Sequence, residues 1–403
     1  MNFIRNNIPF ALMIGASGAL FLTNLLIKKY TSDTIYSYFA IFIIYSGYTT
    51  SLGLLASEQV ALRYAKISNK KTIIEREVLI LILASTTLAA FAFSILAKLL
   101  FKEIDIYVAC LCILTFLSAC LTTIAYNHHR LQGNFNKAQF IQNSWKYFLP
   151  LLFASQYLLT QPISKESIST FLSASLLISI AISIHTLYSN RTNISIVRSN
   201  NPKYKELIIS QIGFITSLSF LSMANTFDKV YIEHFLSKKE FADYFFTSLI
   251  LMYPTLTLSN YIGFKEFTKI KNGANYNLNK TVTKLFLLGI AIFISNASVI
   301  YIFKESIPIF WNANIVILLM ILSATRLPYS FLSAVMGAKS PASKMFSSNI
   351  ISWGLSFVLI TLFFLLDKSL FNALLCTTLI WIMRDAVYYV YAKKNLTLAL
   401  QKK

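Results

Sequence analysis

Ionisable side chains inside long apolar segments are the residues of this sequence best placed to do chemistry. Arg326 lies about 17 residues into such a segment, deeper than the other basic residues, and Pro328 follows it. Lys146, Lys229 and Arg384 lie nearer the ends of their segments. Ionisable groups at such depths are costly and therefore indicate function. The four basic residues predict a cationic site for an anionic head group, because the forked donors of arginine suit phosphate.

Acidic and amide side chains accompany the basic ones. Asp228 and Glu58 are the candidates for coupling to an ion such as a proton or sodium. Four polar residues share one helical face by their spacing of i, i+3, i+4 and i+7, and a further amide lies close before Asp228. These predicted lining residues of a hydrated cavity are Gln139, Gln142, Asn143 and Lys146 on the first face, and Asn225 on the second.

A second interpretation applies to the residues near segment ends. Lys146, Arg384 and Glu58 lie close to one membrane interface by residue count, and Asp228 and Lys229 lie close to the other. Long basic side chains at an interface extend into the head groups without binding a substrate. The sequence therefore favours function most clearly at Arg326.

The elements that carry these residues are long and apolar. About twelve stretches of roughly 18–25 residues recur along the chain, and about 20 helical residues cross the hydrocarbon core of a bilayer. The chain is 56% hydrophobic and only 13% charged. It therefore predicts an all-α polytopic membrane protein with about 12 transmembrane helices. The predicted spans are 9–27, 36–56, 78–100, 106–126, 138–159, 168–187, 207–227, 241–262, 282–303, 309–336, 349–366 and 370–391.

The positive charge is unevenly distributed among the loops. The formal net charge is +20, and the basic residues gather in alternate connections and in the C-terminal tail, whereas the other connections are short and nearly neutral. This asymmetry predicts a multi-pass membrane protein with both termini and the long basic loops in the cytoplasm. It also argues against nucleic acid as the partner.

Two halves of the chain show a short similarity. The segment 27–38 after the first span resembles the segment 232–244 after the seventh, and each leads into a span. This favours two six-helix bundles of the same orientation, an arrangement typical of transporters. The predicted domains are residues 1–190, a basic cytoplasmic linker at 191–206, and residues 207–403.

Motifs of enzymes and metal sites are missing from the sequence. It contains no nucleophile elbow, phosphate-binding glycine loop or metal-binding histidine cluster. Cys110 and Cys112 lie within an apolar span without a nearby histidine or carboxylate, which is a poor metal site. We therefore predict neither an enzyme nor a cofactor or metal.

The segment 225–244, NTFDKVYIEHFLSKKEFADY, resembles the seventh helix of polysaccharide flippases of the MATE/MOP superfamily. There an Asp followed by a basic residue precedes a short outer loop that ends in Tyr, a pattern that Asp228, Lys229 and Tyr244 match. The segment 53–63, GLLASEQVALR, is similar to the cytoplasmic end of the second helix in that family. The other charged positions vary among members, so only Asp228 and Lys229 carry over by motif.

The resemblance implies a Wzx-like flippase of O-antigen or capsule units, within lipopolysaccharide or polysaccharide biosynthesis. Such a protein moves an undecaprenyl-diphosphate-linked oligosaccharide from the cytoplasmic to the outer leaflet by alternating access of two lobes. The implied partners are this lipid, bilayer lipids, a coupling proton or sodium ion, and a polysaccharide polymerase. A cationic cavity fits, since a diphosphate needs counter-charge in a low dielectric.

Other functions remain open on the sequence. A MATE-type multidrug or cation antiporter has the same architecture, but a drug cation favours acidic groups over the excess of basic ones here. A membrane enzyme of polysaccharide assembly, a polymerase or ligase, typically carries a large outer loop, and these outer loops are short. A channel would require a selectivity filter, and no segment repeats like one.

Overall fold

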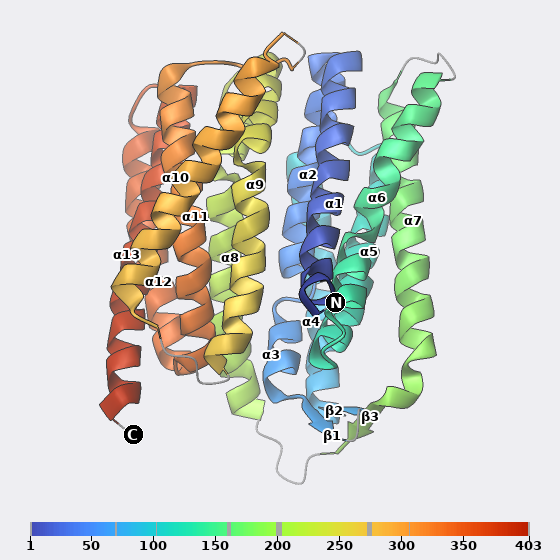
Figure 1. Cartoon of the computed structure of the whole chain (residues 1–403). Helices are drawn as coiled ribbons and strands as arrows, with labels where there is room; N and C mark the ends of the chain where they lie inside the picture. Colours follow the sequence, from blue (N-terminus) through green and yellow to red (C-terminus); the bar gives the residue numbers. More distant parts are fainter. Residues whose placement is uncertain are drawn as a thin grey trace. The chain divides into compact units, whose positions relative to one another are not determined.

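The computed structural model describes residues 2–68, 71–101, 103–158, 163–198, 204–271, 276–305 and 307–401. In these ranges the chain forms twelve long helices, a short helix and three short strands (Figure 1). Each predicted span has a long helix at its position, so the predicted all-α membrane fold is confirmed. The long helices are α1 (Asn2–Tyr30), α2 (Asp33–Leu52), α4 (Arg76–Leu100), α5 (Ile106–Leu131), α6 (Phe135–Leu158), α7 (Lys165–Ser189), α8 (Tyr204–Phe235), α9 (Lys238–Lys271), α10 (Leu278–Ile302), α11 (Ala313–Lys339), α12 (Ala342–Phe364) and α13 (Leu370–Gln401).

Most of these helices are suited to lipid by length and composition. Over the described residues, ten are long and apolar enough to cross a membrane. Two of the most apolar ones are poorly covered by protein: 22% of the apolar window of α4 is buried, and 17% of that of α10. Phe91 of α4 and Ile302 of α10 are 73% and 75% exposed. Exposed apolar helix surface of this extent belongs in lipid, and the chain is a multi-pass membrane protein.

The chain divides into two compact units. Unit 1 is Met1–Ser219 and unit 2 is Phe220–Lys403, so the division falls within α8. The predicted linker at 191–206 contains a short 3-10 turn, η1 (Arg191–Asn193), and the strand β3 (Ile194–Val197). The assignment of residues 1–190 and 207–403 as domains stays a prediction.

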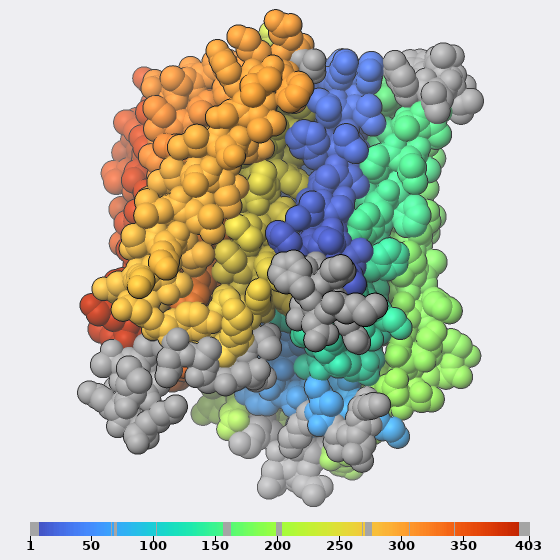
Figure 2. All heavy atoms as spheres, viewed as in Figure 1, coloured from blue at the N-terminus to red at the C-terminus, as the bar shows by residue number. Residues whose placement is uncertain are grey.

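Unit 1 is built around α5 and α6. Helix α1 packs against α6, and α5 packs against α6, α7 and α2. Figure 2 shows α1 in blue beside α6 in teal on the visible face of this unit. The phenol of Tyr147 on α6 donates to the backbone carbonyl of Leu12 on α1 at 2.6 Å. This bond satisfies a hydroxyl that would otherwise be costly within the membrane.

The helix of the predicted second span is interrupted near its end. Helix α2 stops at Leu52, and a turn leads into the short helix α3 (Ser57–Tyr64). Leu55 and Ala56 adopt φ of 44° and 60°, the left-handed region. A β-carbon at Gly53 would lie 2.5 Å from the carbonyl oxygen of Thr49, so the turn requires glycine there. Helix α2 therefore ends four residues before the predicted span end at residue 56, because this turn interrupts the helix.

A small sheet joins two connections of unit 1 that the sequence treats as loops. Strands β1 (Lys66–Ser68) and β2 (Lys71–Glu75) pair antiparallel, and β2 pairs in parallel with β3. Thr72 and Ile74 are in register with Ile194 and Ile196. The sheet therefore ties the segment after α3 to the segment after α7.

Helix α11 is the buried helix of unit 2. It packs against α9, α10 and α13, and 72% of its apolar window is buried. A β-carbon at Gly289 of α10 would lie 2.8 Å from the Cα of Ala324 on α11, so the two backbones meet closely at that glycine. Pro254 lies within α9 and Pro328 within α11 without ending either helix. Arg326 lies halfway along this buried helix.

Candidate functional site

Arg326 is the centre of a polar cluster in unit 2. Its side chain is 5% exposed, and its guanidinium carbon lies 3.6 Å from the ring centroid of Trp381 on α13. One terminal nitrogen donates to the side-chain carbonyl of Asn225 on α8. Stacking on an indole face stabilises a desolvated guanidinium. The cation deepest in the predicted spans is therefore held by an aromatic ring and an amide.

Asp228 has its own partners in the same cluster. The hydroxyl of Tyr244 on α9 donates to its carboxylate, and Lys229 Nζ lies 3.4 Å from the same oxygen. Lys229 also donates to the backbone carbonyl of Asn225 at 3.0 Å. Asp228 interacts electrostatically with Arg326. The structure thus brings four of the predicted residues, Arg326, Asn225, Asp228 and Lys229, into one cluster.

Aromatic side chains surround Arg326. The indole N–H of Trp381 donates to the backbone carbonyl of Ala224 at 2.9 Å. Tyr329 packs edge-on against Trp381, with 5.0 Å between ring centroids, and stacks on Tyr388 at 5.7 Å. Aromatic pairs in these geometries are favourable beyond the area they bury. The Trp381 ring thus packs against the guanidinium of Arg326 and is itself contacted by Tyr329.

Arg384 is fully buried and contacts Tyr388, one of these rings. It donates to Asn349 on α12 at 2.7 Å and to the hydroxyl of Tyr388 at 2.6 Å. Its guanidinium carbon lies 3.9 Å from the Tyr388 ring centroid and 4.3 Å from that of Phe220. The interpretation that Arg384 extends to the head groups is therefore wrong, because the side chain is enclosed by these partners.

The predicted polar stripe of unit 1 forms a chain of hydrogen bonds along α6. Lys146 Nζ donates to the Asn143 side chain at 2.9 Å, and Asn143 donates to the backbone carbonyl of Gln139 at 3.0 Å. Gln139 and Asn143 are buried, whereas Gln142 and Lys146 are half-buried. The spacing therefore predicted correctly that Gln139, Asn143 and Lys146 lie together.

Glu58 lies elsewhere in unit 1, on α3. Its side chain is 6% exposed and accepts one hydrogen bond, from Gln59 at 3.3 Å. Its other carboxylate oxygen has no hydrogen-bond partner in the part of the chain that the structure describes. It is placed by the turn at residues 53–56 rather than by α2.

Several buried polar residues escaped the sequence analysis. Asn127, His128 and His129 lie within the last turns of α5, which runs five residues beyond the predicted end of that span. All three are buried, and in the described residues both imidazoles are without hydrogen-bond partners. The adjacent histidines at a predicted span end were the available signal. The sequence carried no such signal for Trp381, since an apolar helix commonly contains tryptophan.

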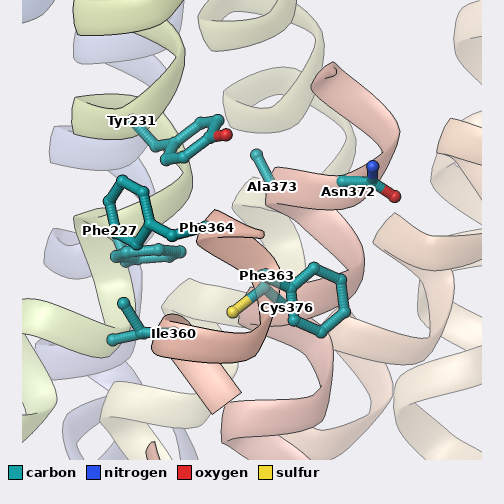
Figure 3. A pocket seen from close by; sticks show the side chains of 8 residues that line it. All are labelled: Phe227, Tyr231, Ile360, Phe363, Phe364, Asn372, Ala373 and Cys376. Carbon is teal, nitrogen blue, oxygen red and sulfur yellow. The ribbon is translucent and has the colours of Figure 1, made fainter. Parts of the chain in front are cut away.

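A crevice in unit 2 lies between α8, α12 and α13 (Figure 3). It has about 200 Å³ of empty volume but is too narrow for a water molecule. Its lining contains no charged side chain and consists of Phe227, Tyr231, Ile360, Phe363, Phe364, Asn372, Ala373 and Cys376. An aromatic crevice without a charged side chain is a poor site for an anion, so the charged cluster around Arg326 is the better candidate site.

Comparison with known proteins identifies the fold. No family model and no curated protein matches the sequence. Among solved structures, an outward-facing multidrug resistance MATE transporter of the MOP superfamily has a TM-score of 0.58 at 12% identity, covering 99% of this chain and 96% of that one. A MATE in the straight conformation gives 0.58 at 13% identity, with the same coverage. A MATE in the bent conformation gives 0.53 at 13% identity, covering 99% of this chain and 95% of that one. The chain therefore has the fold of the MATE transporters of the MOP superfamily.

Proposed function

We propose that this protein is a flippase that carries an undecaprenyl-diphosphate-linked oligosaccharide from the cytoplasmic to the outer leaflet of the bacterial inner membrane. The observation that carries the proposal is the burial of Arg326 halfway along α11, against Trp381 and Asn225. An arginine at that depth is costly unless it serves a ligand or a permanent partner. Its direct partners among the described residues are an aromatic ring and a neutral amide, so no ion pair within those residues compensates its charge.

A diphosphate is the anion best matched to such a group. Moving it through a low-dielectric region requires nearby positive charge, and guanidinium binds phosphate oxygens through paired donors. Lys229 and Arg384 add positive charge to the same unit. The amides and lysine along α6 provide donors and acceptors of the kind that sugars need.

Alternating access is the transport mechanism we infer for the chain. The solved proteins of this fold include a MATE in a straight conformation and one in a bent conformation. Pro254 and Pro328 interrupt the backbone bonding of α9 and α11, and a proline within a helix provides a point of bending. Conformational change in unit 2 would then alter the surroundings of Arg326 during transport.

A multidrug or cation antiporter is the second candidate. It is favoured by the likeness to a multidrug resistance MATE transporter and by the buried carboxylate of Asp228. Asp228, however, already accepts a hydrogen bond from Tyr244 and lies beside Lys229. A carboxylate with those partners is a weaker attraction for a drug cation than an unpaired one.

Complementation distinguishes the two functions. The chain is expressed in a bacterium whose polysaccharide-unit flippase is deleted and which makes the cognate repeat, and surface polysaccharide is assayed on a gel. We expect restoration by the unaltered chain and a loss of at least ten-fold in Arg326→Gln at equal membrane abundance. Lys284→Gln, which removes an exposed positive charge from α10, serves as the matched control and should restore fully.

The same variants are tested for drug export. In a strain without its own multidrug exporters, the flippase function predicts no gain in resistance to cationic drugs. Resistance without restored polysaccharide would overturn the flippase and establish the antiporter. Restored polysaccharide that is unaffected by Arg326→Gln would retain the flippase and exclude Arg326 as its anion site.

A further inference from the structure

Two of the buried polar atoms of unit 2 that have no hydrogen-bond partner among the described residues belong to oppositely charged side chains. One is the donor Nε of Arg326, and the other is the acceptor Oδ1 of Asp385. The two side chains interact electrostatically, yet none of the ion pairs between described residues joins them. Buried polar groups are almost always paired in proteins, so an orphaned donor and an orphaned acceptor in the same region require an explanation.

Aromatic rings lie beside Arg326 and on the helical face that carries Asp385. Trp381, Asp385 and Tyr388 follow each other on α13 at i, i+4 and i+7, which places them on one helical face. Arg326 lies over the Trp381 ring, and Tyr329 contacts both Trp381 and Tyr388. The region therefore combines a cation, a carboxylate and several ring faces.

Asp228, in the same unit, is a carboxylate that has hydrogen-bond donors. It accepts from the Tyr244 hydroxyl and lies 3.4 Å from Lys229 Nζ. Asp385 Oδ1 has no such donor. Of the two carboxylates that interact electrostatically with Arg326, Asp385 is therefore the one with a free acceptor for a ligand.

A sugar phosphate has the chemistry to satisfy both atoms. Phosphate oxygens accept from a guanidinium, sugar hydroxyls donate to a carboxylate, and the C–H faces of a sugar ring pack on aromatic rings. We propose that Arg326, Trp381 and Asp385 form a sugar-phosphate site, in which Arg326 binds the phosphate and Asp385 accepts a hydroxyl of the adjacent sugar. The proposal rests on the proposed function and assigns the sugar contact within it.

The site is closed in this structure. Trp381 is 1% exposed and Arg326 is 5% exposed, so a ligand reaches them only when α11 and α13 rearrange. That rearrangement changes the surroundings of the Trp381 indole, which makes its emission a reporter of binding. The chain has three other tryptophans, Trp145, Trp311 and Trp353, and their replacement by Phe leaves Trp381 as the single emitter.

Binding is measured by Trp381 emission in the full chain in lipid nanodiscs. Two probes are titrated: the lipid-linked oligosaccharide extracted from cells that make this protein, and undecaprenyl diphosphate without sugar. We expect Asp385→Ala to weaken binding of the first about ten-fold and to leave the second unchanged, since a lost hydrogen bond to a charged group has about this effect. Arg326→Gln should weaken both.

Two further variants make the result decisive. Asp385→Asn retains the shape and an acceptor oxygen, and should show a smaller loss that is again confined to the oligosaccharide. Asp367→Ala removes an exposed carboxylate before α13 and should bind both probes normally. Equal weakening of both probes by Asp385→Ala and Asp385→Asn, or no weakening by either, overturns the sugar contact. Failure of the unaltered chain to bind either probe overturns the proposed function itself.

Discussion

The guanidinium of Arg326 stacks on the indole of Trp381, 3.6 Å from its ring centroid, and the same indole donates to the Ala224 carbonyl. Trp381 thus joins α11, α13 and α8 through two polar interactions. A guanidinium buried in this way depends on the ring, because Trp381 and the Asn225 amide are the direct partners of its side chain among the described residues. The stability of unit 2 should therefore depend on Trp381.

Trp381→Phe tests this dependence. Phenylalanine keeps a ring but lacks the N–H and the larger face of tryptophan. We therefore expect the free energy of unfolding to fall by about 1–2 kcal/mol, because one hydrogen bond and part of a cation–π contact are lost. Thermal unfolding of the purified protein in detergent measures it. Trp311→Phe is the control, since the Trp311 N–H has no hydrogen-bond partner in the described residues. Equal shifts in the two variants would contradict the role of Trp381.

Gly289 sets the distance between α10 and α11. A β-carbon there would lie 2.8 Å from the Cα and 3.1 Å from the carbonyl oxygen of Ala324, which are backbone atoms that cannot move aside. We expect Gly289→Ala to lower stability by about 1–3 kcal/mol, the usual effect of overpacking. Gly354→Ala on α12 is the matched control, because nothing lies within 4 Å of its added carbon. The control should be neutral or stabilising by up to about 1 kcal/mol, because alanine favours helix over glycine.

The residues that the sequence predicted well are those governed by local periodicity. The twelve long helices follow from apolar length, and the contacts among Gln139, Asn143 and Lys146 follow from helical spacing. The partners of Arg326 follow from neither, because Asn225 and Trp381 lie on other helices and nothing local pairs them with it. Contacts between helices depend on packing, which the apolar pattern alone leaves undetermined.

Local structure also differed where the backbone departs from the helix. The left-handed conformation of Leu55 and Ala56 falls on residues that rarely adopt it, so the break before α3 had no sequence signal apart from Gly53. The extension of α5 to Leu131 moved His128 and His129 from a predicted loop into a buried helix end. The basic residues at 66–76 predicted which side of the membrane the loop faces, but they gave no indication of its short strands.

Asp105 begins α5 and provides a pH-dependent contribution to stability. The Val108 backbone N–H donates to its carboxylate at 2.8 Å, and Lys165 Nζ lies 2.9 Å away. These contacts hold the pKa of Asp105 below its ordinary value. Because this pKa is lowered by folding, the ionised carboxylate stabilises the folded state. That stabilisation is complete above about pH 4, the pKa of aspartate in an unfolded chain, and it disappears as the pH falls through the folded-state pKa.

Asp105→Ala should therefore lower the melting temperature at pH 5–8, and its difference from the unaltered protein should shrink below about pH 4. Thermal unfolding across pH 3–8 measures the effect. Glu103→Ala, which removes a neighbouring exposed carboxylate, is the control and should show no such convergence. A difference that persists at the lowest pH would show that Asp105 acts without its charge.

Tyr244 and Asp228 form a buried hydrogen bond between α9 and α8. Tyr244→Phe removes the hydroxyl that donates to the Asp228 carboxylate. Because Asp228 is only 1% exposed, the carboxylate is left buried with one donor fewer, and we expect the free energy of unfolding to fall by about 1–3 kcal/mol. The loss arises from the pair, and it should nearly vanish when Asp228 is already alanine. A double-mutant cycle of Tyr244→Phe and Asp228→Ala, followed by thermal unfolding, measures this coupling. Additive losses in the double variant would mean that Tyr244 stabilises α9 through ring packing, and would free the Asp228 carboxylate for the coupling role predicted from the sequence.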